Sequence, residues 1–105
     1  METRKFLCAR CGRFHEEKNV MDFLGNLYHR ISIYFGYSSP FDEETLELHI
    51  CELCLFDILR SFKHRPLIDG DDIVTAFDKF RRKEGPYYED YFIKMYHRLE
   101  QLPIK

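Results

Sequence analysis

The chain has 105 residues, a length that fits one small domain with a modest core. Apolar residues make up 45% and charged residues 32%, which is the balance of a globular rather than a disordered chain. The net charge is -2, from 16 basic and 18 acidic side chains. Proteins that bind nucleic acid through phosphate contacts are usually basic, so this charge disfavours that class.

The chain also gives no sign of membrane insertion. No run approaches the roughly 20 apolar residues that cross a bilayer, and no apolar stretch follows Met1–Lys5 as in a signal peptide. We therefore expect a cytoplasmic protein. In a reducing compartment, four cysteines in two close pairs indicate metal or redox chemistry before disulfides.

The first half of the chain predicts strands. Residues 6–14 predict a short strand that enters a tight turn, and residues 15–26 predict a loop or a short strand. Residues 27–36 and 45–50 alternate apolar with polar side chains, and residues 36–44 have turn composition. The two alternating runs should pair as an antiparallel hairpin, with these side chains on shared faces: Leu27, His29, Ile31, Ile33 and Phe35; Leu46, Leu48 and Ile50.

The second half predicts three helices. The first follows Cys51 and ends before Pro66, and the second follows the cap candidates in Asp69–Asp72 and stops at Gly85. Pro86 suits the first turn of the third helix. The apolar stripes of these helices are, in order, Leu55, Ile58, Leu59 and Phe62; Ile73, Phe77 and Phe80; Tyr88, Phe92, Met95, Leu99 and Leu102.

The cysteine spacing is the most specific signal in the chain. Cys8 and Cys11, like Cys51 and Cys54, are three residues apart, so each pair can reach one ion from a tight turn. Gly12 follows the first pair, where a left-handed backbone is often needed. The second pair stands where a strand passes into a helix, whose positive N-terminus favours thiolates. We predict one structural Zn²⁺ per chain, without which the chain does not fold properly.

Other interpretations of the cysteines stay open. Cys51 and Cys54 follow a strand and open a helix, as in a thioredoxin-like redox site, although the chain lacks βαβ alternation. Iron, an iron–sulfur cluster or structural thiols are further alternatives. His15 and His49 lie close to the cysteines in sequence and could each replace one of them as a ligand.

The order of turn, hairpin and two ligands at a helix start resembles the treble-clef zinc folds. More narrowly, Gly36–Ser39 and Leu48–Cys54 are similar to segments of small uncharacterised bacterial proteins that combine Cys-x-x-Cys-Gly, Gly-Tyr-Gly-Ser and Leu-His-Leu-Cys-x-x-Cys. Here Ser38 replaces the second glycine of the loop. The resemblance covers residues 6–62 and implies a zinc-bound fold without implying an activity.

The predicted fold class is therefore α+β, a treble-clef-like zinc core (zinc knuckle, β-hairpin, helix) with two appended C-terminal helices. One domain should span residues 1–105, with the zinc-binding core at 1–65 and the helical extension at 66–105. Some treble-clef proteins are HNH nucleases, but the required histidines with an acidic neighbour are missing here. The acidic segment Asp69–Asp72 lacks the ligand spacing of a calcium loop, so we interpret it as a helix cap. The basic run Lys79–Lys83 could contact phosphate, but we interpret it as the solvated end of a helix.

We expect a protein-binding adaptor or regulatory protein and not an enzyme, because no nucleophile–base arrangement is present. The partner would be another protein or a second copy of the chain, and no small-molecule substrate is indicated. Tyrosine is enriched at interfaces, and the third helix carries three tyrosines off its stripe: Tyr87, Tyr91 and Tyr96. The alternative is a nucleic-acid-binding zinc finger, for which Arg4, Lys5, Arg10 and Arg13 with Tyr28 or Tyr34 would supply contacts.

Overall fold

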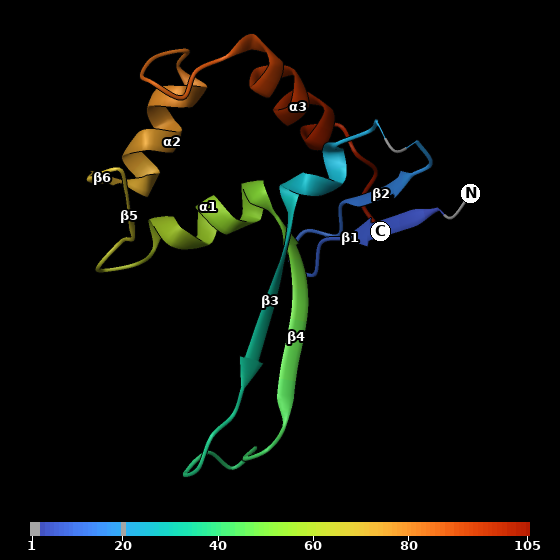
Figure 1. Cartoon of the computed structure of the whole chain (residues 1–105), viewed down its shortest axis with the longest axis vertical. Helices are drawn as coiled ribbons and strands as arrows, with labels where there is room; N and C mark the ends of the chain where they lie inside the picture. The colour runs from blue at the N-terminus through green and yellow to red at the C-terminus, as the bar shows by residue number, and fades with distance from the viewer. Residues whose placement is uncertain (1–2, 20) are drawn as a thin grey trace. The chain divides into compact units, whose positions relative to one another are not determined.

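The computed structural model describes residues 3–19 and 21–105. Over these residues the chain is α+β, with three α-helices, one short 3-10 helix and three two-stranded antiparallel hairpins (Figure 1). It forms two compact units, one running to Cys51 and including Pro103–Lys105, the other spanning Glu52–Leu102. The α+β class is as predicted, while the expectation of one domain over 1–105, divided after residue 65, stays a prediction.

In the first unit, strands β1 (Arg4–Leu7) and β2 (Phe14–Glu17) pair antiparallel. The strand that was predicted to enter a tight turn within residues 6–14 is β1, which begins two residues earlier, at Arg4, and ends at Leu7 before the turn that carries Cys8 and Cys11. The 3-10 helix η1 (Leu24–Leu27) then occupies the end of the segment predicted as loop or short strand. Strand β2 shows no apolar alternation because its buried residues, His15 and Glu17, are polar.

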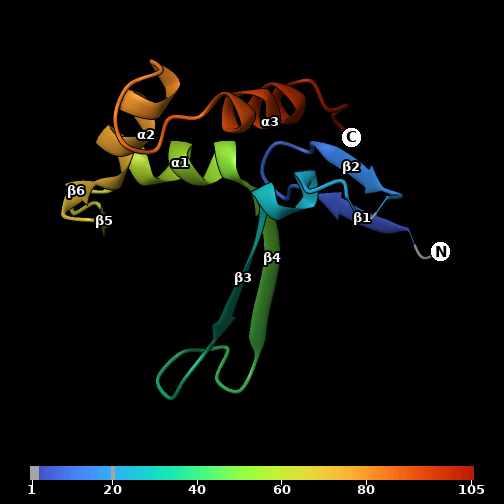
Figure 2. The ribbon, with the colours of Figure 1, turned by 45° about the horizontal axis from the view of Figure 1, so that its top comes forward.

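Strands β3 (Tyr28–Tyr34) and β4 (Thr45–Cys51) form the predicted hairpin. Ile31 lies opposite Leu48 and Ile33 opposite Leu46, as the alternation requires. Both ribbon views show a long arm whose loop lies far from β1 and β2 (Figures 1 and 2). Toward that loop the large apolar side chains are exposed: Ile33, Tyr34, Tyr37, Phe41 and Leu46.

The base of this arm is tied to the first cysteine turn. The N–H of Ala9 donates to the carbonyl of His49 at 2.8 Å, and the N–H of Phe14 donates to that of Pro103 at 2.8 Å. The C-terminal residues thus belong to the first unit. Its buried apolar side chains are these: Cys8, Leu24, Tyr28, Ile50 and Cys51.

The second unit contains α1 (Glu52–Arg60), β5 (Leu67–Ile68), β6 (Asp71–Asp72), α2 (Ile73–Arg81) and α3 (Asp90–Glu100). Asp72 caps α2, because its carboxylate accepts from the N–H groups of Val74 and Thr75. Asp69 and Gly70 have φ angles of 49° and 83° and form the turn of the β5–β6 hairpin. The capping interpretation of this acidic segment is confirmed, and its Asp-Gly turn is an additional role.

Aromatic packing forms the core of the second unit. Phe56 of α1 stacks on Phe77 of α2 with ring centroids 4.2 Å apart. Tyr96 of α3 packs against Phe77 and Phe80 at 5.6 and 5.2 Å. Leu99 is fully buried. Of the predicted stripes, Phe77 and Phe80 of α2 and Met95 and Leu99 of α3 belong to this core. Phe92 of the α3 stripe is 43% exposed, and Tyr96 was predicted to lie off the stripe.

The start of α3 differs from the prediction. Pro86 does not lie in its first turn; it lies with Tyr87 in a turn after Gly85, whose φ is +85°. Glu89 is extended, with φ −149° and ψ 142°, and the helix begins at Asp90. Within residues 3–19 and 21–105, every helix is too short or too polar to traverse a lipid bilayer.

Candidate metal centre

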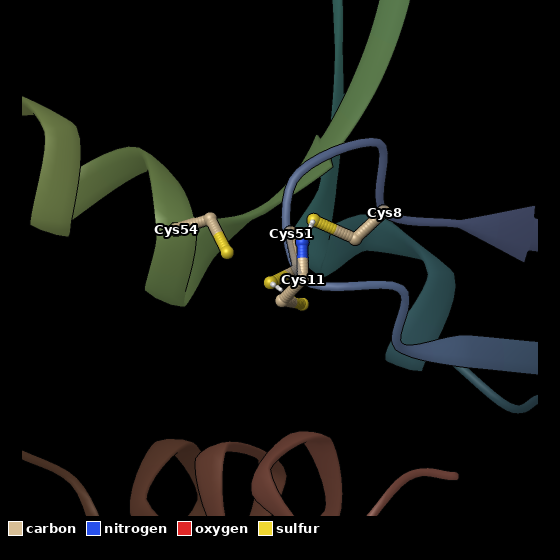
Figure 3. A group of neighbouring side chains, drawn as sticks. All are labelled: Cys8, Cys11, Cys51 and Cys54. Carbon is tan, nitrogen blue, oxygen red and sulfur yellow. Dashed lines mark hydrogen bonds between the residues drawn. The ribbon is translucent and has the colours of Figure 1, made fainter. Parts of the chain in front are cut away.

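The four cysteines come together. Cys8 and Cys11 lie in the turn between β1 and β2, Cys51 ends β4, and Cys54 lies in the first turn of α1 (Figure 3). Their four Sγ atoms all lie within 4.8 Å of one another. Cys8, Cys51 and Cys54 are buried and Cys11 is half-buried. This cluster could hold one metal ion, as the cysteine spacing predicts.

The first turn is shaped to present its sulfurs. The N–H of Cys11 points at Sγ of Cys8, at 3.4 Å, and the N–H of Arg13 points at Sγ of Cys11, also at 3.4 Å. Gly12 donates to the carbonyl of Cys8 at 2.9 Å and has a φ of +82°. That left-handed backbone is cheap only for glycine, which explains the residue at this position.

The surroundings favour negative charge on the sulfurs. The guanidinium of Arg13 donates to Sγ of Cys11 at 3.2 Å. Burial alone would raise the pKa of Cys8, but the N–H groups of Cys11, Cys51 and Arg10 outweigh it and lower that pKa to about 6. Since metals bind the thiolate form, this environment prepares Cys8 as a ligand.

Tyr28 supports the same turn from β3. Its hydroxyl donates to the carbonyl of Arg13 at 2.9 Å. Burial raises the pKa of Tyr28, and the neighbouring sulfurs of Cys51, Cys11 and Cys8 raise it further, so the phenol stays neutral. A neutral phenol is a hydrogen-bond donor and adds no charge beside four sulfurs.

The distances fit a single soft metal ion. Sγ of Cys11 lies 3.7 Å from Sγ of Cys51. Two sulfurs bound tetrahedrally to one zinc at about 2.3 Å are roughly 3.8 Å apart. The redox alternative needs only Cys51 and Cys54, and it gives no reason for Cys8 and Cys11 to join them.

The two histidines considered as alternative ligands lie elsewhere. His49 is an exposed residue of β4. His15 of β2 is buried and belongs to a second group, with Glu17 and Asp22, whose ligand atoms also lie within 4.8 Å of one another. Among the described residues, neither histidine joins the cysteine group. The sequence analysis missed this second group, although His15 and Glu17 stand at the i and i+2 spacing of one strand face.

The three tyrosines proposed for protein contact differ in exposure. Tyr96 is only 7% exposed, and its hydroxyl donates to the carboxylate of Glu52. The prediction that Tyr96 faces a partner is therefore wrong, because the aromatic core of the second unit buries it. Tyr87 is half-buried and donates to the carboxylate of Asp69, whereas Tyr91 is 51% exposed.

Several basic residues of the nucleic-acid alternative already have partners. The guanidinium of Arg4 lies 3.7 Å from the carboxylate of Glu17, and that of Arg13 contacts Cys11. In the C-terminal basic run, Arg81 pairs with Glu100 at 2.6 Å. These pairings reduce the charge available for phosphate.

Comparison of the chain with known protein families, with curated proteins and with solved structures gave no match. The functional interpretation therefore rests on the geometry of the chain itself.

Proposed function

We propose that the four cysteines hold one structural Zn²⁺ in a treble-clef-like core, and that the protein is a small adaptor or regulatory protein that binds another protein. Cysteine turn, hairpin and helix start follow one another in the treble-clef order. The S–S separation of 3.7 Å fits two thiolates on one tetrahedral ion, and four cysteines are a usual ligand set of structural zinc. Four thiolates complete its coordination and leave no position for water, which favours a structural over a catalytic role.

The observation that carries the binding function is the exposed apolar pair Ile33 and Leu46 on the hairpin arm. These residues lie opposite each other and are 44% and 43% exposed. Farther along, Tyr37 is 93% and Phe41 59% exposed. A two-stranded hairpin is marginally stable alone, and exposed contiguous apolar groups mark interaction sites.

The charge beside this patch indicates the kind of partner. Asp42, Glu43 and Glu44 follow Phe41 directly and are all exposed. A surface that combines apolar side chains with basic groups would complement the loop. The occupant we propose is therefore a different protein with an apolar, basic-rimmed site.

The test begins with a photo-crosslinking residue in place of Tyr37, in the full chain expressed in its native cell. The crosslinked protein is identified, purified and titrated calorimetrically against the zinc-loaded chain. The double variant Ile33→Thr and Leu46→Thr keeps strand-forming side chains but removes apolar area, and Ser32→Thr on the opposite face is the matched control. We expect the double variant to weaken binding at least about tenfold, a change of about 1.4 kcal/mol.

Equal affinity of the double variant and the control would refute the role of the arm. Light scattering measures the mass of the free chain and shows whether a second copy of the chain binds the arm instead. A dimer that the double variant dissociates would show that the arm binds itself and would overturn the proposal of a different partner.

A further inference from the structure

A second group of ligand-type side chains lies in the first unit. His15, Glu17 and Asp22, here termed the histidine–carboxylate cluster, place one ligand atom each within 4.8 Å of the others. His15 and Glu17 are each only 8% exposed. They lie on one face of β2, and Asp22 reaches them from the following turn, where its N–H donates to the carbonyl of Asn19 at 2.9 Å.

The ring nitrogen of His15 is placed unusually in this cluster. Its Nε2 is buried and lies 3.1 Å from Oδ2 of Asp22. Within the described part of the chain this nitrogen nevertheless has no hydrogen bond, because the oxygen does not lie where a ring N–H would point. A buried polar nitrogen without such a bond is destabilising, so a ligand that satisfies it would be stabilising.

We propose that the histidine–carboxylate cluster binds one divalent first-row transition metal ion. Nitrogen and oxygen ligands bind such ions at about 2.0–2.2 Å, so two ligands at an angle of 90–110° are roughly 3.0–3.5 Å apart. The separation of 3.1 Å between Nε2 and Oδ2 has this value. Two atoms that bind the same ion lie side by side without a hydrogen bond between them. Nε2 of His15 and Oδ2 of Asp22 are arranged in this way.

Charge supports the same assignment. The carboxylates of Glu17 and Asp22 carry two negative charges, which a divalent cation would balance. The exposed Arg4 lies 3.7 Å from Oε1 of Glu17 and offsets part of the charge of that carboxylate. Placing the buried carboxylate of Glu17 beside a second carboxylate is unfavourable, and a bound cation would relieve it.

Neighbouring groups hold the carboxylates in place. Oδ1 of Asp22 accepts from the N–H of Leu24 at 3.1 Å, and Oε2 of Glu17 accepts from the N–H of Gly25 at 3.3 Å. Hydrogen bonds of this kind orient the ligands of metal sites. The ion would fasten the turn between β2 and η1, and with three protein ligands it would keep at least one position for water.

The cluster differs in chemistry from the four cysteines. It offers nitrogen and oxygen rather than thiolate, so it suits Mn²⁺, which thiolates bind poorly. We expect it to bind more weakly than the cysteine centre, because it has one ligand fewer. Mn²⁺ is therefore a suitable probe, because it should bind this cluster and leave zinc bound to the cysteines.

The experiment titrates the zinc-loaded chain with Mn²⁺ and follows free Mn²⁺ by its electron paramagnetic resonance signal. We expect about one bound Mn²⁺ per chain. Asp22→Asn keeps an acceptor for Leu24 and should lower affinity at least about tenfold, as should His15→Gln. His64→Gln, an exposed histidine of the second unit, is the matched control and should bind as the wild type does.

The proposal is overturned if the wild type binds no Mn²⁺, since His15 and Asp22 then form only an ion pair. It is equally overturned if Asp22→Asn and His15→Gln, with circular dichroism spectra like that of the wild type, bind Mn²⁺ unchanged. Should either variant unfold, Glu17→Gln gives the same test. None of these outcomes depends on the hairpin arm.

Discussion

The backbone N–H of Lys105 donates to the carbonyl oxygen of Gly12 at 2.8 Å, so the C-terminal end of the chain lies against the first cysteine turn. A Cβ atom on Gly12 would stand 2.4 Å from the carbonyl oxygen of Lys105. Together with the φ of +82°, this contact makes any side chain at position 12 unfavourable.

Gly12→Ala should therefore destabilise the zinc-loaded chain by about 1–3 kcal/mol, the usual cost of a strained left-handed residue. Gly36→Ala is the control, because nothing lies within 4 Å of its added Cβ. Denaturant unfolding followed by circular dichroism measures both. Equal midpoints for the two variants would contradict this account of the turn.

Loss of a cysteine ligand should be far more damaging than loss of the nearby histidine. Cys51→Ser removes one of four sulfurs in a buried cluster, so the variant should lose its zinc and unfold or aggregate. His49→Gln, two residues away on the exposed side of β4, should keep both metal and fold. Elemental analysis measures the zinc content of both variants, and thermal unfolding measures their stability. The prediction is refuted if Cys51→Ser stays folded with zinc bound.

The tyrosines of α3 should separate into core and surface. Tyr96 is buried against Phe77 and Phe80, so Tyr96→Ala should cost about 3 kcal/mol or more in unfolding free energy. Tyr91 is half exposed, and Tyr91→Ala should stay within about 0.5 kcal/mol of the wild type. A Tyr91 effect as large as that of Tyr96 would contradict the packing described for the second unit.

Acidity should weaken the metal-free chain. The pKa of Cys8 is lowered from 9.0 to about 6, so between these values the folded chain binds fewer protons than the unfolded chain. The stabilisation is complete above pH 9 and is lost as the pH falls to about 6. In chelator the chain should be mostly unfolded at every pH, and the small folded fraction that remains should rise with pH across this range; Cys8→Ser should reduce the rise. A folded fraction that stays constant or falls as the pH rises would refute this role of the Cys8 thiolate.

The sequence predicted the parts of the fold that have a clear period. Ile31, Ile33, Leu46 and Leu48 alternate, and this pattern placed the β3–β4 hairpin correctly. Helix α2 was placed by its stripe and by the cap at Asp72. The cysteine cluster was predictable because two short spacings fix two ligands each, whatever the chain does between them.

Other parts lacked such a signal. The buried positions of β2 are His15 and Glu17, whose polarity hides the alternation of the strand. Asp22 joins them through a turn, which no spacing rule describes. Pro86 suited a helix start, yet the extended backbone at Glu89 delays α3 to Asp90. Tyr96 appeared off the stripe because the sequence does not show that Phe77 and Phe80 of α2 both pack against it.

Zinc K-edge X-ray absorption of the purified chain, dialysed to remove weakly bound ions, tests the central claim most directly. We predict about one zinc per chain, coordinated by four sulfurs at about 2.3 Å. A folded chain without zinc, or a zinc shell that contains nitrogen or oxygen in place of any of the four sulfurs, would contradict a structural four-cysteine centre.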